Sequence, residues 1–358
     1  MNKPKLLLST WYPIFNSEGT SVRVKRVLKT LKSDFDVHVV TSANKDRDCC
    51  KKKLHVLKPE KSVLWPLKLV PIILDHNFEI VICENDWFGF PVYWLFSKIK
   101  KYKLVFEAHG VLSAEGKDWG NSFIMIKFYM FIEKFCLKHS DLIIALSNEI
   151  KKEYESYNSN IVMIPVFLNN KPFNNLQKNL NNSTNKTIGL VGPFGSKRNR
   201  YYAPDFLYKN IDKFDKSFNF VIVGKCEKKV KNSRISYSGY LKSFDEYINL
   251  IASIDALLVI EKRKTSGPLN KILEAMACCT PVFTTPKGIF GLENVKNGEN
   301  IIVANESELI NKINTLLCED EIIKKITENA KRTFESFYSY ENNHQKIVES
   351  LKTLLLEK

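Results

Sequence analysis

Short, wholly apolar runs alternate with longer amphipathic stretches along most of this 358-residue chain. Residues 142–146 (LIIAL) are apolar on both faces, as expected of a parallel strand buried between two layers of helices. Residues 21–31 instead repeat apolar side chains at 24, 27, 28 and 31, which is the spacing of one helical face. This alternation is typical of βαβ units and predicts an α/β protein with doubly wound parallel sheets.

The predicted elements fall into two sets separated by one polar segment. Strands are predicted at residues 6–9, 37–41, 54–57, 80–83, 104–107, 142–146, 162–164, 188–191, 218–223, 235–237, 256–260, 281–284 and 301–303. Residues 169–186 are rich in Asn and Lys and nearly lack large apolar side chains, which is typical of a linker. We predict domains at 1–168 and 187–338, and a C-terminal helix at 339–358 that can pack back on the first domain. Both domains are expected to be Rossmann-like and to face a central cleft.

The formal net charge of +15 favours anionic partners such as nucleotides, lipid head groups or nucleic acid, although basic residues spread over solvated faces would give the same total. The eight cysteines form no C-x-x-C pair, so a zinc ribbon or redox motif is not supported. No run reaches the length of about 18 apolar residues that a membrane span needs. We therefore expect a cytoplasmic protein, with peripheral contact at the inner face of an anionic membrane as an open alternative.

Two other segments allow a different interpretation. Residues 123–132 and 65–70 are apolar and carry lysine, so they could contact a membrane or a lipid-linked molecule. Packing inside the first domain is the interpretation we prefer for both, with 123–132 as a core helix. Residues 46–48 (DRD) match the D-x-D tripeptide of metal-dependent transferases, but we regard this as a chance match and expect no metal.

The segment most suited to chemistry begins where a strand ends near Ile260. A cationic loop follows, then Gly267, and then Pro268, which we place at the first helical position because the N–H that proline lacks would be unpaired there. The free N–H groups and the dipole of such a helix start favour a phosphate. A plain surface loop with a satisfied helix cap would explain the same pattern.

Two charged side chains of that helix extend the hypothesis. Lys271 would add positive charge beside a phosphate. Glu274 lies seven residues after Gly267, where a carboxylate can accept hydrogen bonds from both hydroxyls of a ribose. The residues alone thus suggest an anion site with room for a nucleotide.

Residues 266–282 (SGPLNKILEAMACCTPV) resemble the donor-site signature of the retaining GT-B glycosyltransferases of group 1, also called family 4. Typical members read glycine, then L-E-A-M-A, two small residues and P-V. The resemblance continues at 284–292 and 297–300 and extends over nearly the whole chain. Its other motifs are at residues 17–20 (SEGT), 107–110 (EAHG), 191–195 (VGPFG), 218–224 (FNFVIVG) and 238–241 (SGYL).

The resemblance implies transfer of a sugar from a nucleotide-diphosphate donor to a glycan or lipid-linked acceptor, with retention and without a metal or cofactor. It implies catalytic roles for His109, Lys197 and Lys271. It implies donor contacts for Gly19, Gly192, Gly195, Arg198, Gly224, Tyr240, Leu241, Ser266, Gly267, Pro268, Leu269, Asn270 and Glu274. In the family, His109 would reach the donor sugar and the reaction centre.

The sequence departs from the family pattern at two places. Many members have a pair of acids separated by seven residues. Glu274 fills the second position of that pair, and Ser266, eight positions earlier, stands in the first. The basic pair usual on the first loop of the second domain is not plainly aligned, and Lys197 and Arg198 are the candidates for it. We therefore keep two alternatives, a sugar-nucleotide epimerase of the same fold and a non-catalytic partner subunit. Specific nucleic-acid binding is not expected, because no recognised motif supports it.

Overall fold

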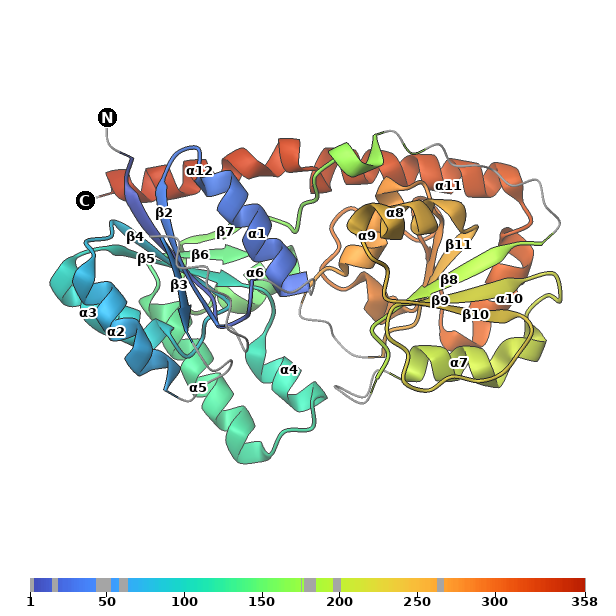
Figure 1. Ribbon diagram of the computed structural model, residues 1–358, viewed down its shortest axis with the longest axis horizontal. Coiled ribbons are helices and arrows are strands. Elements are labelled where there is room, and N and C mark those ends of the chain that lie inside the picture. The colour runs from blue at the N-terminus through green and yellow to red at the C-terminus, as the bar shows by residue number, and fades with distance from the viewer. Residues whose placement is uncertain are drawn as a thin grey trace. The chain divides into compact units, whose positions relative to one another are not determined.

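The computed structural model describes residues 3–14, 19–42, 53–57, 64–174, 176, 185–195, 201–262 and 267–357. The chain forms two compact units (Figure 1). Unit 1 comprises Met1–Val166 and Asn343–Lys358, and unit 2 comprises Phe167–Asn342. The chain thus enters unit 2 just before the segment predicted as a linker, and its last helix returns to unit 1.

Unit 1 is built on a parallel sheet. Its strands within the described residues are β1 (Lys5–Ser9), β2 (Asp36–Ser42), β3 (Leu54–Leu57), β4 (Ile80–Glu84), β5 (Lys103–Ala108), β6 (Leu142–Ala145) and β7 (Ile161–Met163). Their order in the sheet is β3-β2-β1-β4-β5-β6-β7. The chain therefore winds outward from β1 in one direction and then, from β4, in the other. In such sheets ligands bind beyond the carboxyl ends of the strands where the winding reverses, here β1 and β4.

Helices cover both faces of this sheet. They are α1 (Gly19–Leu31), α2 (Trp65–Asp75), α3 (Phe90–Lys100), α4 (Leu112–Asp118), α5 (Phe123–His139), α6 (Asn148–Tyr154) and most of α12 (Tyr340–Leu356). In Figure 1, α2, α3 and α5 lie on one face, and α1 and α12 lie on the other. The helices lie on opposite faces because the crossovers are right-handed and run in opposite directions from the centre of the sheet.

Unit 2 repeats the arrangement. Its strands within the described residues are β8 (Thr187–Val191), β9 (Asn219–Val223), β10 (Ile235–Gly239), β11 (Ala256–Val259), β12 (Val282–Thr284) and β13 (Ile302–Val303). Their order is β10-β9-β8-β11-β12-β13, so the winding reverses between β8 and β11. Its helical segments are η1 (Lys171–Phe173), α7 (Tyr202–Asn210), η3 (Ile211–Lys213), α8 (Phe244–Ser253), α9 (Asn270–Ala277), η4 (Pro286–Ile289), α10 (Glu306–Leu316), α11 (Asp320–Thr333) and the π turn η5 (Phe334–Tyr338).

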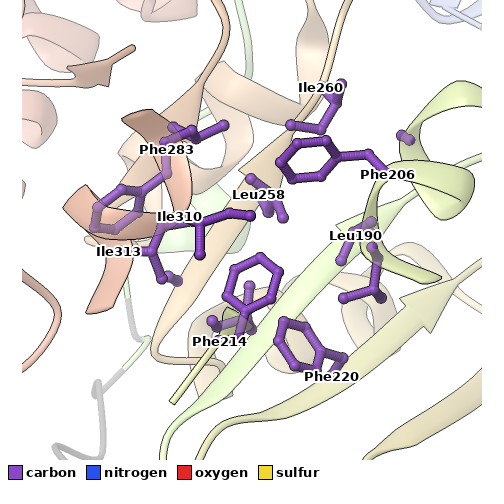
Figure 2. Close-up of a cluster of buried hydrophobic side chains, with 14 of the residues drawn as sticks. Leu190, Phe206, Phe214, Phe220, Leu258, Ile260, Phe283, Ile310 and Ile313 are labelled. Atoms are coloured by element: carbon purple, nitrogen blue, oxygen red, sulfur yellow. The ribbon is translucent and has the colours of Figure 1, made fainter. Parts of the chain in front are cut away.

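One core cluster joins the sheet of unit 2 to its helices. Figure 2 shows Leu190 of β8 and Leu258 of β11 close to Phe206 of α7. On the other side of the cluster, Phe283 of β12 packs with Ile310 of α10. These side chains are buried, and their burial fixes the positions of β8, β11 and β12, and with them the carboxyl ends of these strands.

The thirteen predicted strands are all present, each within two residues of its predicted bounds. The start of α9 is a correction. Pro268 is not the first helical residue, because α9 begins at Asn270 and Leu269 is its extended N-cap, with φ −77° and ψ 111°. Proline fixes φ but allows an extended ψ, so Pro268 fits the incoming loop as well as a helix.

The interpretation of residues 123–132 as a core helix is also wrong. Helix α5 forms there, but within this stretch only Ile132 is buried. Phe123, Ile124 and Phe131 are 71%, 79% and 66% exposed. Of residues 65–70, Trp65 and Leu69 are buried, as predicted, while Leu67 is exposed. Within the described ranges, no helix combines the length and apolar character needed to cross a bilayer.

Candidate functional site

Three glycines lie at the carboxyl ends of neighbouring strands in unit 2. Gly192 N donates to Val223 O (2.9 Å), and Gly224 N donates to Gly239 O (2.8 Å), so these strand ends are directly connected. Gly224 and Gly239 have φ of +91° and +68°, which favours glycine. A Cβ on Gly192 would lie 2.8 Å from the backbone nitrogen of Phe194. The carboxyl ends of β8, β9 and β10, beside the point where the winding of the sheet reverses, therefore carry no side chains at these glycines. A large anion can approach the backbone closely there.

Helix α9 begins on the other side of this reversal, after β11. The Nζ atom of Lys271 donates to the carbonyl of Val191 (2.8 Å) and lies 6.0 Å from the centroid of the Phe194 ring. The ammonium group is thus held at the end of β8, next to Gly192. The side-chain oxygen of Asn270 is buried and has no hydrogen-bond partner within the described part of the chain. The ammonium group of Lys271 and the side-chain oxygen of Asn270 therefore both lie at the start of α9, where the sequence predicts the diphosphate.

The loop before α9 packs against a second glycine-bearing segment. Gly291 has φ of +72°, and a Cβ placed on it would lie 3.1 Å from Cδ and 3.3 Å from N of Pro268. Only glycine fits this close approach without displacement. The resemblance noted for residues 284–292 thus has a physical basis, since this segment supports Gly267 and Pro268.

Glu274 lies one turn after Asn270 on the same face of α9. It is 8% exposed, and its Oε2 accepts a hydrogen bond from the Tyr247 hydroxyl of α8 (2.8 Å). Burial and the neighbouring Glu274 charge raise the pKa of Tyr247, so its hydroxyl stays a donor. Tyr247 holds the carboxylate in one orientation, and sequence analysis missed it because no motif joins the two helices.

The other predicted donor contacts are distributed around this edge. Tyr240 follows β10 and is 74% exposed, and Leu241 beside it is half-buried. A Cβ on Gly195 would lie 2.8 Å from the carboxylate of Glu227. Gly19 is in unit 1, where it opens α1. Lys197, Arg198 and Ser266 lie outside the described residues, as do residues 46–48.

In unit 1, His109 follows β5 and joins a buried group of charges. Glu84 and Glu107 are register partners on β4 and β5, so their carboxylates lie side by side. The Nε2 atom of His109 is 3.3 Å from Glu84 Oε1 and 3.6 Å from Glu107 Oε1. Arg23 of α1 pairs with Glu107, with Nε 2.7 Å from Oε1, and also donates to the carbonyl of Pro165. All four charged side chains are buried.

The group is stable because its charges balance. Burial lowers the pKa of His109, but Glu107 and Glu84 outweigh burial and raise it to about 9. Burial alone would raise the pKa of Glu107, yet Arg23 and His109 hold it below its usual value. Burial and the Glu107 charge raise the pKa of Glu84. His109 is therefore protonated at neutral pH and acts as a cation rather than as a base.

Sequence analysis identified His109 but missed Glu84 and Arg23. Both oxygens of Glu84 are buried. Its Oε1 faces Nε2 of His109 at 3.3 Å, and its Oε2 has no hydrogen-bond partner among the described residues. Asp86, two residues later, is different, because it accepts bonds from Ser9, Trp65 and the backbone of Gly89. Asp86 therefore has a structural role, whereas Oε2 of the fully buried Glu84 keeps acceptor capacity.

Two family models match the chain. The Glycosyltransferase Family 4 model matches residues 17–169, and the model described as Glycosyl transferases group 1 matches residues 185–319. Between them they cover most of both units. No curated protein sequence matches the chain.

Solved glycosyltransferase structures share the whole fold. HepE of Anabaena, in complex with UDP and glucose, is 17% identical, with a TM-score of 0.73, over 98% of this chain and 100% of HepE. Sucrose-phosphate synthase of Thermosynechococcus elongatus is 14% identical, with a TM-score of 0.78, over 100% of both chains. A glycosyltransferase of Rickettsia africae is 20% identical, with a TM-score of 0.71, also over 100% of both. The two units thus have the GT-B fold.

Proposed function

Because this chain belongs to the group 1 (family 4) glycosyltransferases, we propose that it transfers a sugar from a nucleoside-diphosphate donor to a glycan or lipid-linked acceptor. We further propose that transfer retains the anomeric configuration and needs no metal ion. The observation that carries the proposal is the strand edge of unit 2, where glycine backbones, Lys271 and Glu274 surround the start of α9.

The diphosphate would lie against Gly192 and the first N–H groups of α9, whose dipole favours negative charge. Lys271, already held at the end of β8, would supply a full positive charge. Glu274, oriented by Tyr247, would accept bonds from the ribose hydroxyls. Since solved HepE structures hold UDP and UDP-glucose, uridine diphosphate sugars are the first donors to test.

In the reaction, the bond between the anomeric carbon and the diphosphate oxygen breaks, and the acceptor oxygen bonds to the same face of the sugar while its hydroxyl proton passes to the departing diphosphate. Negative charge develops on the leaving diphosphate. Donors fixed in place before the reaction stabilise such charge without reorganising, which is a large source of catalysis. We assign this role to the α9 start and Lys271, with Lys197 and Arg198 as further cations. Protonated His109 would donate to a hydroxyl of a substrate bound by unit 1.

Calorimetric titration with UDP tests the donor site. Glu274→Gln should weaken UDP binding, because a neutral amide is a poorer acceptor for two hydroxyls than a carboxylate. Glu308→Gln, at an exposed position of α10, is the matched control and should leave binding unchanged. Equal affinities of all three proteins would remove Glu274 from the donor site.

The chemistry is tested separately, with a radiolabelled donor screen followed by NMR of the product. Retention predicts the same anomeric configuration in donor and product. Activity should survive EDTA, and Lys271→Ala should slow transfer more than it weakens UDP binding. An inverted product would refute retention, and a strict metal requirement would refute the metal-independent mechanism. Neither result would contradict the donor site.

One observation favours the epimerase alternative. Acids beside a histidine are what such an enzyme would need, and Glu84, Glu107 and His109 form that group. An epimerase would convert the sugar nucleotide without an acceptor and incorporate solvent deuterium into the sugar. Deuterium-free product made only in the presence of acceptor would exclude it. UDP binding without turnover would favour the non-catalytic subunit.

We also propose that α5 contacts an anionic membrane that carries the acceptor. Its first half exposes Phe123, Ile124 and Phe131, and Lys127 lies among them. Apolar side chains flanked by lysine suit the interface of a bilayer with anionic lipids. The chain should cosediment with phosphatidylglycerol vesicles and not with phosphatidylcholine vesicles. Ile124→Asp should reduce this binding, while Ile322→Asp, on exposed α11, should not.

A further inference from the structure

Three histidines from separate elements of unit 1 converge away from the charged group described above. His38 lies in β2 opposite Leu7, His55 lies in β3, and His76 follows the last residue of α2. Each offers a ring nitrogen, and these three atoms lie within 4.8 Å of one another. The strand ends that carry Glu84 and His109 are a separate part of the sheet, so this cluster does not belong to the proposed transferase site.

From this convergence we infer that His38, His55 and His76 form a binding site for a divalent transition metal, Zn²⁺ in the first instance. Imidazole nitrogens are preferred ligands of Zn²⁺, Ni²⁺ and Cu²⁺, whereas Mg²⁺ and Ca²⁺ prefer oxygen. Three histidines leave a fourth position for water or another ligand. The inference does not depend on the proposed function.

The spacing of the rings suits this ion. Zn–N bonds of 2.0–2.1 Å in a tetrahedron place two ligand nitrogens about 3.3 Å apart. Nδ1 of His38 and Nε2 of His55 are 3.4 Å apart. The ring of His76 lies 4.6 Å from that of His38 and 5.6 Å from that of His55, measured between centroids. The ring nitrogen that His76 offers lies within 4.8 Å of the other two.

The surroundings also fit a metal ion. Phe78 packs beneath the cluster, with ring centroids 5.4 Å from His38 and 5.5 Å from His76, and forms an apolar floor. His38 is buried while His55 and His76 are half-buried, so an ion can enter from their side.

The test is titration of the EDTA-stripped full chain with Zn²⁺ against a chromophoric chelator, and with Co²⁺ followed by visible absorption. We expect one equivalent of Zn²⁺ and the intense bands of tetrahedral Co²⁺. His55→Gln and His76→Gln, both at half-buried positions, should each weaken binding by more than about 100-fold, since losing a second-shell partner already costs about 10–100-fold. Circular dichroism of the two variants is the control for folding, and their spectra should match that of the wild type.

The matched control is His139→Gln. His139 is exposed, and its ring contacts Trp94 at a tilt and Phe135 edge to face, with centroids 4.8 and 4.6 Å away. Its loss should leave Zn²⁺ binding unchanged. Absence of stoichiometric binding, or equal affinity of wild type, His55→Gln and His76→Gln, would overturn the inference. Binding lost in His109→Gln but kept in His55→Gln would also overturn it, because the ion would then be at the buried carboxylates.

Discussion

Replacing Arg23 by Met removes one cation from the buried charged group of unit 1 while keeping most of the side-chain volume. Glu107, whose side chain is 0% exposed, then loses its 2.7 Å partner and shares His109 with Glu84. Breaking a buried ion pair in this way costs about 3–5 kcal/mol, because it leaves a buried charge uncompensated. In a unit of this size each kcal/mol lowers the melting temperature by about 2–4 °C, so we expect a fall of about 6–20 °C.

Differential scanning calorimetry measures this fall. Lys352→Met is the control within unit 1, since Lys352 pairs with Asp34 at an exposed position, where a pair contributes at most about 1 kcal/mol. Adding Glu107→Gln to Arg23→Met removes the carboxylate that lost its partner. The double variant should therefore lose less stability than the sum of the losses measured for the two single variants. Equal, small losses for Arg23→Met and Lys352→Met, or strict additivity in the double variant, would refute the reasoning.

Three further predictions follow from particular contacts. Protonated His109 contributes about 3 kcal/mol to the stability of unit 1. This contribution is fully present below a pH of about 6.5, the pKa of the histidine in the unfolded chain, and it is lost as the pH rises through about 9, its pKa in the folded chain. Melting temperatures from pH 7 to 10 should therefore fall less steeply in His109→Gln than in wild type. Gly291→Ala should lower the stability of unit 2 more than Gly298→Ala, because both have positive φ but only at Gly291 does a Cβ meet other atoms closely. Tyr247→Phe removes the donor to Glu274 and should cost about 1–3 kcal/mol in urea unfolding, and unchanged stability would show that water replaces the hydroxyl.

The fold was predictable from local sequence because the central strands of both sheets, such as β4, β6 and β11, are buried along their whole length. A strand such as β6 is apolar at every position, and no helix period explains so short a run. The alternation with helices then restricts the topology to right-handed crossovers. The sequence could not tell which face of a helix is covered. Ile124 and Ile132 look alike in sequence, yet one is 79% exposed and the other is buried.

The candidate site was predictable only where one continuous segment carries it. The loop and helix around Gly267 and Glu274 are contiguous, so the family resemblance identifies them together. Arg23 and Glu107 are 84 residues apart in sequence, and their contact depends on α1 packing against the end of β5. Tyr247 meets Glu274 across two helices for the same reason. Pairings of this kind follow from tertiary packing, which no local pattern specifies.

The two units place different chemistry on the same strand order. In unit 2, the edge around the reversal carries no side chain at Gly192 and Gly224, and the start of α9 together with Lys271 can supply the N–H groups and the positive charge that a diphosphate requires. In unit 1, the corresponding edge carries Glu84 and Glu107 as register partners, and these carboxylates already pair with the two cations of the buried group, Arg23 and His109. The donor-site resemblance of residues 266–282 points to unit 2, and the positive charge that Lys271 holds at the end of β8 agrees with it.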